Sequence, residues 1–308
     1  MADGLTDFTW TVSRTGYRWI RAVPHVDRGE PRFPDWYLTD GVPLSRMRDF
    51  LSYDPLGDRS GLFKVFAETE ATKDGILAFA NAHGSLGLAI ALDLIDGERE
   101  GPIDGEQLAA WRASVLEMRA AVELWDAART SSMEKLSQCL KWTSDTSIAY
   151  TGPHLALMIS AQGEPGLFAT WRPGELIGPA LYVVQHRINH ALLQHGVVAR
   201  LLWDSRWAKL SLLMVPRTLI GCMWLQFAKA VDGDKEYRQC ENCRAWFEVG
   251  GNRTSRSDKR FCTPTCKAAG HRKKQAEARM LYGRGTPLKE IAQRLGTDAK
   301  TAKGWVSR

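Results

Sequence analysis

The chain has 308 residues, 44% hydrophobic and 25% charged, which allows one large core with a small appendage or two domains. This composition is that of a globular protein, and it excludes low-complexity and repeat architectures. The net charge of +6 is unevenly spread: residues 236–308 hold 17 Lys/Arg against 7 Asp/Glu, whereas the first 235 residues hold 24 against 28. A basic segment of this kind is typical of a surface that binds a polyanion.

Neither the N-terminal residues nor the most apolar stretch of the sequence predicts a signal peptide or a membrane-spanning helix. Residues 1–7 are polar and acidic, with no apolar segment after them. The most apolar stretch, Leu212–Ala228, is interrupted by Pro216 and Arg217 and is too short to span a bilayer, so we expect a buried helix there. We therefore expect a cytoplasmic, nucleoid-associated protein with no membrane partner.

In chain order, strands are predicted first. Phe8–Val12 and Tyr17–Val23 are rich in aromatic and β-branched residues and flank a turn at Ser13–Gly16, a pattern that predicts a hairpin. Pro-containing loops follow. Two helices come next, one capped by Thr72 and ending near Ala82, the other capped by Asp104 and ending near Thr130.

The second of these helices carries an apolar seam. Its members recur at alternating spacings of three and four residues: Leu108, Trp111, Val115, Met118, Val122 and Trp125. Such a seam packs against another helix, and it belongs either to the core or to a dimer interface, the core being favoured.

The rest of the N-terminal region mixes both patterns. Strands are predicted at His154–Ser160 and Leu167–Trp171, and apolar helices at Pro179–His195 and Ser211–Val231. We therefore predict residues 1–235 to be one mainly helical α+β domain that senses a signal or dimerises. The fold class predicted for the whole chain is mainly α.

No constellation in this region predicts an enzyme. His186 and His190 lie four residues apart on a predicted helix, with His195 one further turn along, but no carboxylate occurs between Tyr182 and Trp203 to complete a metal site. We interpret them as ordinary helical histidines, with a ligand pocket as the alternative. Phosphate-binding, dinucleotide and nucleophile-elbow motifs are absent, so no catalytic residues are assigned.

Four of the six cysteines lie close together in the basic segment. Cys240 and Cys243 form one pair, and Cys262 and Cys266 form the second, eighteen residues further on. Two such pairs deliver four soft ligands to one tetrahedral ion, so the sequence predicts a structural Zn²⁺ site; a redox pair or free thiols are the alternatives. Thr263 and Pro264 predict a helix start that places Cys266 in the first turn.

The spacing of this module resembles a known family. Cys240-x₂-Cys243, an aromatic pair, a basic stretch, Arg260-Phe261-Cys262-x₃-Cys266 and a basic helix are similar to the CGNR-type zinc fingers of bacterial regulators. The resemblance implies a treble-clef-like finger after an ABATE-like helical sensing domain. The chain departs from the family at Cys266-Lys-Ala-Ala, where the family carries Cys-Gly-Asn-Arg. With this module at residues 236–274, residues 275–308 are left as a third domain.

Residues 287–306 match a helix-turn-helix. Pro287 opens the first helix after a Thr286 cap, Gly296 supplies the positive φ of the turn, and Asp298 or Thr297 caps the second helix. Ile291, Ala292, Leu295, Ala302, Trp305 and Val306 are expected to face inward. The outer face is then expected to read the major groove through Lys300, Thr301, Lys303, Gly304 and Ser307.

Other basic residues suit phosphates better than bases. These are Arg272, Lys273, Lys274, Arg279 and Arg284. The sequence thus predicts a zinc-containing regulator that binds double-stranded DNA, acts as a homodimer and has room for a small-molecule effector. Two alternatives stay open: an adaptor whose tail binds protein or RNA, and an enzyme whose tail serves for targeting.

Overall fold

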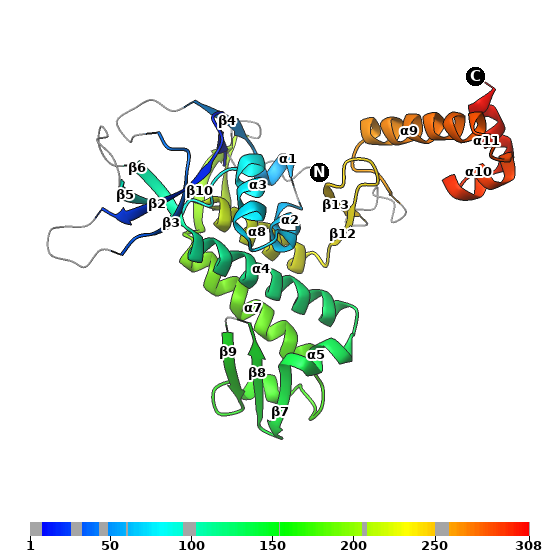
Figure 1. Cartoon of the computed structure of the whole chain (residues 1–308). Helices are drawn as coiled ribbons and strands as arrows, with labels where there is room; N and C mark the ends of the chain where they lie inside the picture. The colour runs from blue at the N-terminus through cyan, green and yellow to red at the C-terminus, as the bar shows by residue number, and fades with distance from the viewer. Residues whose placement is uncertain are drawn as a thin grey trace. The chain divides into compact units, whose positions relative to one another are not determined.

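The protein is described by a computed structural model, which covers residues 8–25, 33–42, 49–59, 61–94, 103–153, 155–204, 208–249 and 259–307 (Figure 1). It divides into two units, Met1–Asp234 and Lys235–Arg308. Pro31 and Pro43 of the predicted loops, His154 at the start of a predicted strand, and residues 250–258 between the two cysteine pairs lie outside the described residues.

The first unit begins with strands that pair over long distances. β1 (Trp10–Ser13) pairs with β4 (Phe50–Tyr53), while β2 (Arg18–Pro24), β3 (Asp35–Thr39), β6 (Ile103–Gln107) and β5 (Ile90–Leu94) close a four-stranded antiparallel barrel. The predicted hairpin between β1 and β2 is therefore wrong. The amide of Tyr17 donates to Asn81 and the Trp10 indole donates to the Ser85 carbonyl, so both strands are held by a segment far along the chain.

The barrel encloses a small apolar core. Ala22, Tyr37, Leu92 and Ile103 are buried in it, each from a different strand, with Ile20 and Leu94 packed against them.

A buried carboxylate fixes the loop before β5. Glu106, 1% exposed, accepts hydrogen bonds from the amides of Leu86, Gly87 and Leu88 at 2.9, 2.6 and 2.7 Å. Burial raises the pKa of Glu106, and the three donors act in the opposite direction by favouring its charged form. This contact satisfies three backbone amides of the loop, of which that of Leu86 is fully buried.

A helical layer forms the main core of the first unit. It comprises α1 (Pro55–Asp58), α2 (Leu62–Glu68), α3 (Lys73–His83), α4 (Leu108–Arg129), α5 (Met133–Cys139), α7 (Ile177–Gln194) and α8 (Leu219–Asp232). Thr72 caps α3 through its side chain, which confirms the prediction. Asp104 does not cap α4: it lies in β6, and α4 starts four residues later because Ile103–Gln107 closes the barrel.

The apolar seam of α4 belongs to this core. All six of its members are buried, and Trp111 and Trp125 pack their rings against Phe66 and Phe227. The seam is thus covered within the chain.

The remaining strands overturn the expected fold class. β7 (Leu140–Ser144), β8 (Ser147–Gly152) and β9 (Leu155–Ser160) form one sheet, and β10 (Val198–Asp204) and β11 (Lys209–Val215) form a ribbon. The described residues hold 13 strands in five sheets, so the prediction of a mainly α fold is wrong.

Two local errors account for part of this difference. The predicted helix at Ser211–Val231 is a strand up to Val215, because Pro216 interrupts the apolar run and α8 starts only at Leu219. The predicted strand at Leu167–Trp171 overlaps α6 (Pro165–Phe168) instead. Apolar runs of this length do not distinguish strand from helix.

The second unit contains β12 (Glu236–Gln239), β13 (Trp246–Val249), α9 (Pro264–Gly283), α10 (Leu288–Leu295) and α11 (Ala299–Val306). α9 runs across residue 274, where a boundary between two domains was expected. Gly296 has φ 59° and ends α10 in the left-handed conformation, as predicted, and Asp298 caps α11. Thr286 caps nothing, because Pro287 itself takes the capping position of α10.

The three helices share one core, made of Ala278, Leu281, Ile291, Ala292, Leu295, Ala302 and Trp305, with Val306 packed against it. Within the described part of the chain, no helix is long and apolar enough to cross a membrane.

One buried histidine makes the stability of the first unit depend on pH. Nδ1 of His83 lies 3.0 Å from a nitrogen of the Arg59 guanidinium and accepts a hydrogen bond from it, which requires a neutral imidazole. Burial and Arg59 lower the pKa of His83 to about 4. The unfolded chain binds a proton near pH 6.5, so the stability that His83 contributes is present above that pH and is lost as the pH falls toward 4.

We therefore expect wild type to lose about 2 kcal/mol of unfolding free energy relative to His83→Gln between pH 7 and pH 4.5, because only the wild type takes up this proton. Denaturant titration at the two pH values measures the difference. His186→Gln, at an exposed position of α7, is the control and should follow wild type. Equal losses in wild type and His83→Gln would contradict the assignment.

Candidate metal centre

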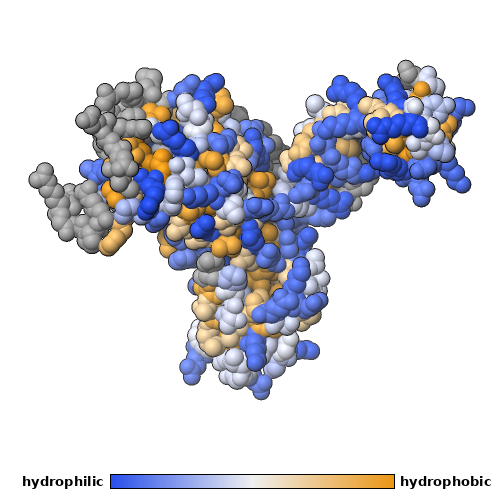
Figure 2. Space-filling model, viewed as in Figure 1, coloured by the Kyte–Doolittle hydropathy of each residue, from blue (hydrophilic) through white to orange (hydrophobic). Residues whose placement is uncertain are grey.

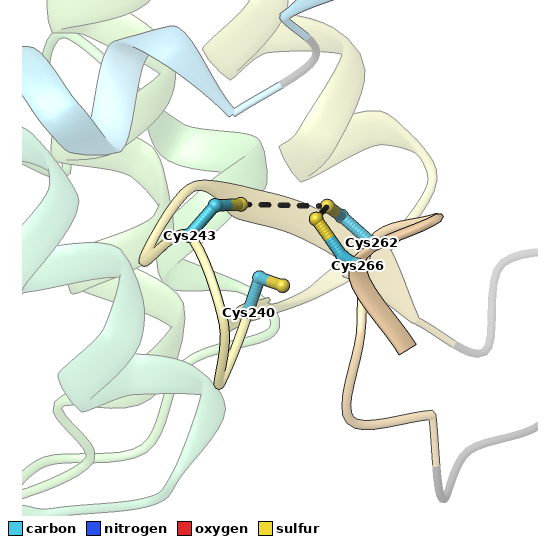
Figure 3. Close-up of side chains that lie close together, drawn as sticks. All are labelled: Cys240, Cys243, Cys262 and Cys266. Carbon is cyan, nitrogen blue, oxygen red and sulfur yellow. Dashed lines mark hydrogen bonds between the residues drawn. The ribbon is translucent and has the colours of Figure 1, made fainter. Parts of the chain in front are cut away.

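The four cysteines of the second unit converge on one point. Cys240 and Cys243 lie in the turn between β12 and β13, Cys262 precedes α9, and Cys266 lies in its first turn (Figure 3). The sulfur atoms of Cys243 and Cys262 are 3.6 Å apart, those of Cys262 and Cys266 are 3.5 Å apart, and all four lie within 4.8 Å of one another.

These distances fit one tetrahedral ion. Ligands at a Zn–S distance of about 2.3 Å stand about 3.8 Å from each other along the edges of a tetrahedron. A disulfide would bring two sulfurs to about 2.05 Å, and all four cysteines are free thiols. The four cysteines can therefore hold a metal ion, and a full set of thiolates leaves no open position for a substrate.

The local backbone explains why each cysteine points inward. The Cys240 amide donates to the Ala245 carbonyl and the Arg244 amide donates to the Cys240 carbonyl, which closes the first turn tightly. Arg244 adopts φ 62°, a left-handed conformation that glycine takes up with less strain. On the other side, the Thr263 hydroxyl accepts from the Cys266 amide at 3.1 Å with Pro264 at the first helical position, as predicted.

Hydrogen bonds prepare two of the four sulfurs, those of Cys240 and Cys266, to carry negative charge. Burial opposes ionisation of Cys240, but donors from the backbone of Cys243, Cys262 and Asn242 prevail and lower its pKa to about 6. The side chains of Asn242 and Thr263 lower the pKa of Cys266. Burial and the neighbouring thiols raise the pKa of Cys262 to about 12. A cation at the centre relieves the repulsion among four such thiolates.

Asn242 is a residue that the sequence did not single out. It lies between the first two cysteines and reaches the fourth, so it links the two halves of the site. Partners of this kind orient metal ligands and are often as important as the ligands. The feature of the sequence that could have identified Asn242 is its position between the two cysteines of the first pair.

The apolar support of the centre is small. Cys240, Phe247 and Val249 are buried, with Phe261, Cys262 and Cys266 packed against them. Phe261 also reaches α9: a Cβ at Gly270 would lie 2.6 Å from its ring, so any side chain at that position would displace the ring. This contact joins the metal-binding module to α9.

The residues assigned to base contacts lie together on α11. Lys300, Lys303, Gly304 and Ser307 are exposed, while Ala302 and Trp305 are buried on the opposite face. Thr301 is half-buried, and both its amide and its hydroxyl donate to Asp298. The visible surface over α9, α10 and α11 is mostly hydrophilic (Figure 2).

The five residues assigned to phosphates divide into two groups. Arg272, Lys273 and Arg284 are exposed. Lys274 donates to the Leu295 carbonyl at 3.0 Å, and Arg279 donates to the Trp305 carbonyl at 2.9 Å. The last two side chains therefore hold the ends of α10 and α11 against α9.

Comparison with known proteins finds no family model, no curated protein and no solved structure that matches the chain. The likeness to CGNR-type fingers stays a prediction from the residues that carry it. Function is accordingly inferred from the chain itself.

Substitution of one ligand, combined with measurement of bound zinc, tests this centre. We expect the purified protein to contain one zinc per chain, and Cys240→Ser to contain none and to lose the folded structure around β12 and β13, because this small apolar cluster cannot fold without the ion. Elemental analysis and circular dichroism measure the two effects. Cys139→Ser, at a half-buried position outside the cluster, should keep its zinc. Full zinc content in Cys240→Ser would rule out the four-cysteine site.

Proposed function

We propose that this protein is a zinc-containing transcriptional regulator that binds double-stranded DNA, with α10 and α11 acting as a helix-turn-helix. The observation that carries the proposal is the two-faced character of α11. Its inner face buries Ala302 and Trp305, while Lys300 and Lys303 stand exposed on the outer face. A recognition helix needs this arrangement, because its outer face enters the major groove while its inner face stays in the core.

Charge supports the same proposal. Residues 236–308 carry 17 Lys/Arg against 7 Asp/Glu, and a zinc ion on four thiolates subtracts about two charges from that balance. The remaining excess is large enough to attract a polyanion. Lys300 and Lys303 suit guanines or phosphates, and Arg272, Lys273 and Arg284 are exposed and suit phosphates.

The homodimer in this proposal is supported by the ribbon of β10 and β11. These strands pair with each other and with no other described strand. Leu201 lies opposite Leu212, and Trp203 opposite Leu210, so the four side chains share one face. They are 60, 72, 64 and 58% exposed, respectively. A contiguous exposed apolar face typically marks an interaction surface, and we propose that a second copy of this chain covers it.

The proposed DNA contact predicts a strong effect of charge reversal on α11. Lys300→Glu with Lys303→Glu should weaken binding to duplex DNA at least 100-fold, because each change replaces an attraction with a repulsion near the phosphates. For wild type, the logarithm of the affinity should fall with the logarithm of salt concentration at a slope of about −4.5 if five phosphates are contacted. Fluorescence anisotropy on genomic duplex fragments measures both.

Lys135→Glu with Lys141→Glu makes the same charge change at exposed positions of the first unit and serves as the control. It should bind DNA as wild type does. DNA binding that survives reversal of Lys300 and Lys303, or that does not depend on salt, would refute the assignment of the contact to these α11 lysines. If wild type bound no duplex DNA, the DNA-binding proposal would fail and the adaptor function would be favoured.

The ribbon predicts the oligomeric state. Wild type should sediment at twice the chain mass of 34.5 kDa, and Leu201→Ser with Leu212→Ser should sediment as a monomer, because polar side chains remove the apolar face. Analytical ultracentrifugation at micromolar concentration measures the mass. Leu193→Ser, at an 82% exposed position of α7, is the matched control and should stay dimeric. A dimer that persists in the ribbon variant would place the interface elsewhere.

A further inference from the structure

A groove of about 700 Å³ lies within the second unit, beside the metal-binding module. One wall is Arg260 and Phe261, which directly precede Cys262, and the far end is the turn at Gly296 and Thr297 that leads into α11. Residues of α9 form the floor between them. The groove therefore connects the two features that define this unit, the four cysteines and the two-helix motif.

The floor of the groove is one continuous stripe of α9. Lys267 and Ala268 each lie three or four residues from both Pro264 and His271, so the four residues share a helix face. At 1.5 Å of rise per residue this stripe is roughly 10 Å long. It ends close to the point where α11 begins, because the same groove is lined by Gly296 and Thr297.

The charges around the groove have one sign. Lys267 and Arg272 are exposed along it, and none of its lining residues is acidic. Arg260 pairs with Glu241, and Lys274 is held by the Leu295 carbonyl, so both are engaged within the protein. Lys267 and Arg272 are consequently the two cations best placed to meet an external anion.

The apolar part of the lining favours one kind of nucleic acid. Trp305 is 8% exposed, with the ring of His271 perpendicular to it at a centroid distance of 5.4 Å, so this indole offers little surface on which an unpaired base could stack. Phe261, Pro264 and Ala268 form a shallow apolar surface instead. A deoxyribose edge flanked by phosphates fits such a surface, with cations on its rim.

We propose that this groove binds the sugar–phosphate backbone of duplex DNA next to the major-groove contact of α11, with Lys267 and Arg272 each pairing with a phosphate. The proposal rests on the proposed DNA-binding function and assigns a second contact to it. It also gives the metal centre a direct part in binding. Phe261 lines the groove and directly precedes Cys262, and an ion held by Cys262 and Cys266 would fix the chain on either side of Pro264.

The test uses the full-length, zinc-loaded protein with Lys267→Gln and Arg272→Gln, which remove charge and keep side-chain length. Affinity for duplex DNA should fall about 10- to 100-fold at 0.1 M salt, and the magnitude of the salt slope should fall by about 1.8, since each lost phosphate contact accounts for about 0.9. The loss should be equal on unrelated sequences, because phosphates carry no sequence information. Lys135→Gln with Lys141→Gln is the charge-matched control.

A second readout avoids substitutions altogether. In wild type, acetylation of Lys267, followed by mass spectrometry, should slow when duplex DNA is added, whereas acetylation of Lys141 in the first unit should not change. Zinc content of the double variant, measured beforehand, shows whether the substitutions disturb the neighbouring cysteines. If the double variant has lost its zinc, its affinity is not informative, and the groove proposal is then tested by whether DNA protects Lys267 of wild type from acetylation.

The outcomes separate this inference from the function on which it rests. If the Lys300 and Lys303 variant loses binding while the zinc-loaded groove variant keeps the affinity and slope of wild type, the groove proposal is wrong and the DNA-binding proposal stands. Unchanged acetylation of Lys267, or tighter binding to a single strand than to its duplex, would also overturn the groove assignment. If wild type binds no DNA, both proposals fail.

Discussion

The convergence of four sulfur atoms is the constraint on which the second unit depends. Among the described residues, the buried cluster around it consists of Cys240, Phe247 and Val249, far fewer than a fold of this size needs to hold itself together. The four cysteines can hold a metal ion, and an ion bound by them would fix the turn after β12 and the first turn of α9 at once. The same helix, α9, continues from the cysteines into the core that it shares with α10 and α11. The arrangement makes one helix serve two modules.

Much of this unit could be predicted because its information is local. The cysteine spacing, the Thr263–Pro264 helix start and the glycine at 296 each specify a short piece of backbone through their own chemistry. The inward positions of α10 and α11 follow from helical periodicity. The hydrogen bonds of Lys274 and Arg279 to the ends of α10 and α11 could not be predicted from local sequence. Their side chains reach carbonyls 21 and 26 residues away, and only the packed helices bring those groups together.

The first unit shows the opposite case. Its barrel is closed by β2, β3, β5 and β6, which are separated along the chain by helices and loops. No local sequence pattern predicts which of these distant strands pair with one another. Asp104 was expected to cap a helix because the sequence beside it resembles a helix start, yet it lies in the strand that closes the barrel. Glu106 follows two residues later, and its role in holding Leu86–Leu88 is visible only after folding. Tertiary pairing overrode local preference at both positions.

The central claim is that the four-cysteine centre orders the start of α9, and amide hydrogen exchange measured with and without a zinc chelator tests it most directly. On metal removal, the amides of Trp246–Val249 and residues 266–271 should lose their protection, while amides in α4 of the first unit keep theirs. The α10 and α11 amides should lose less, because Ile291, Leu295 and Trp305 have an apolar core of their own. Unchanged protection of β13 and the first turns of α9 after complete zinc removal would contradict the account.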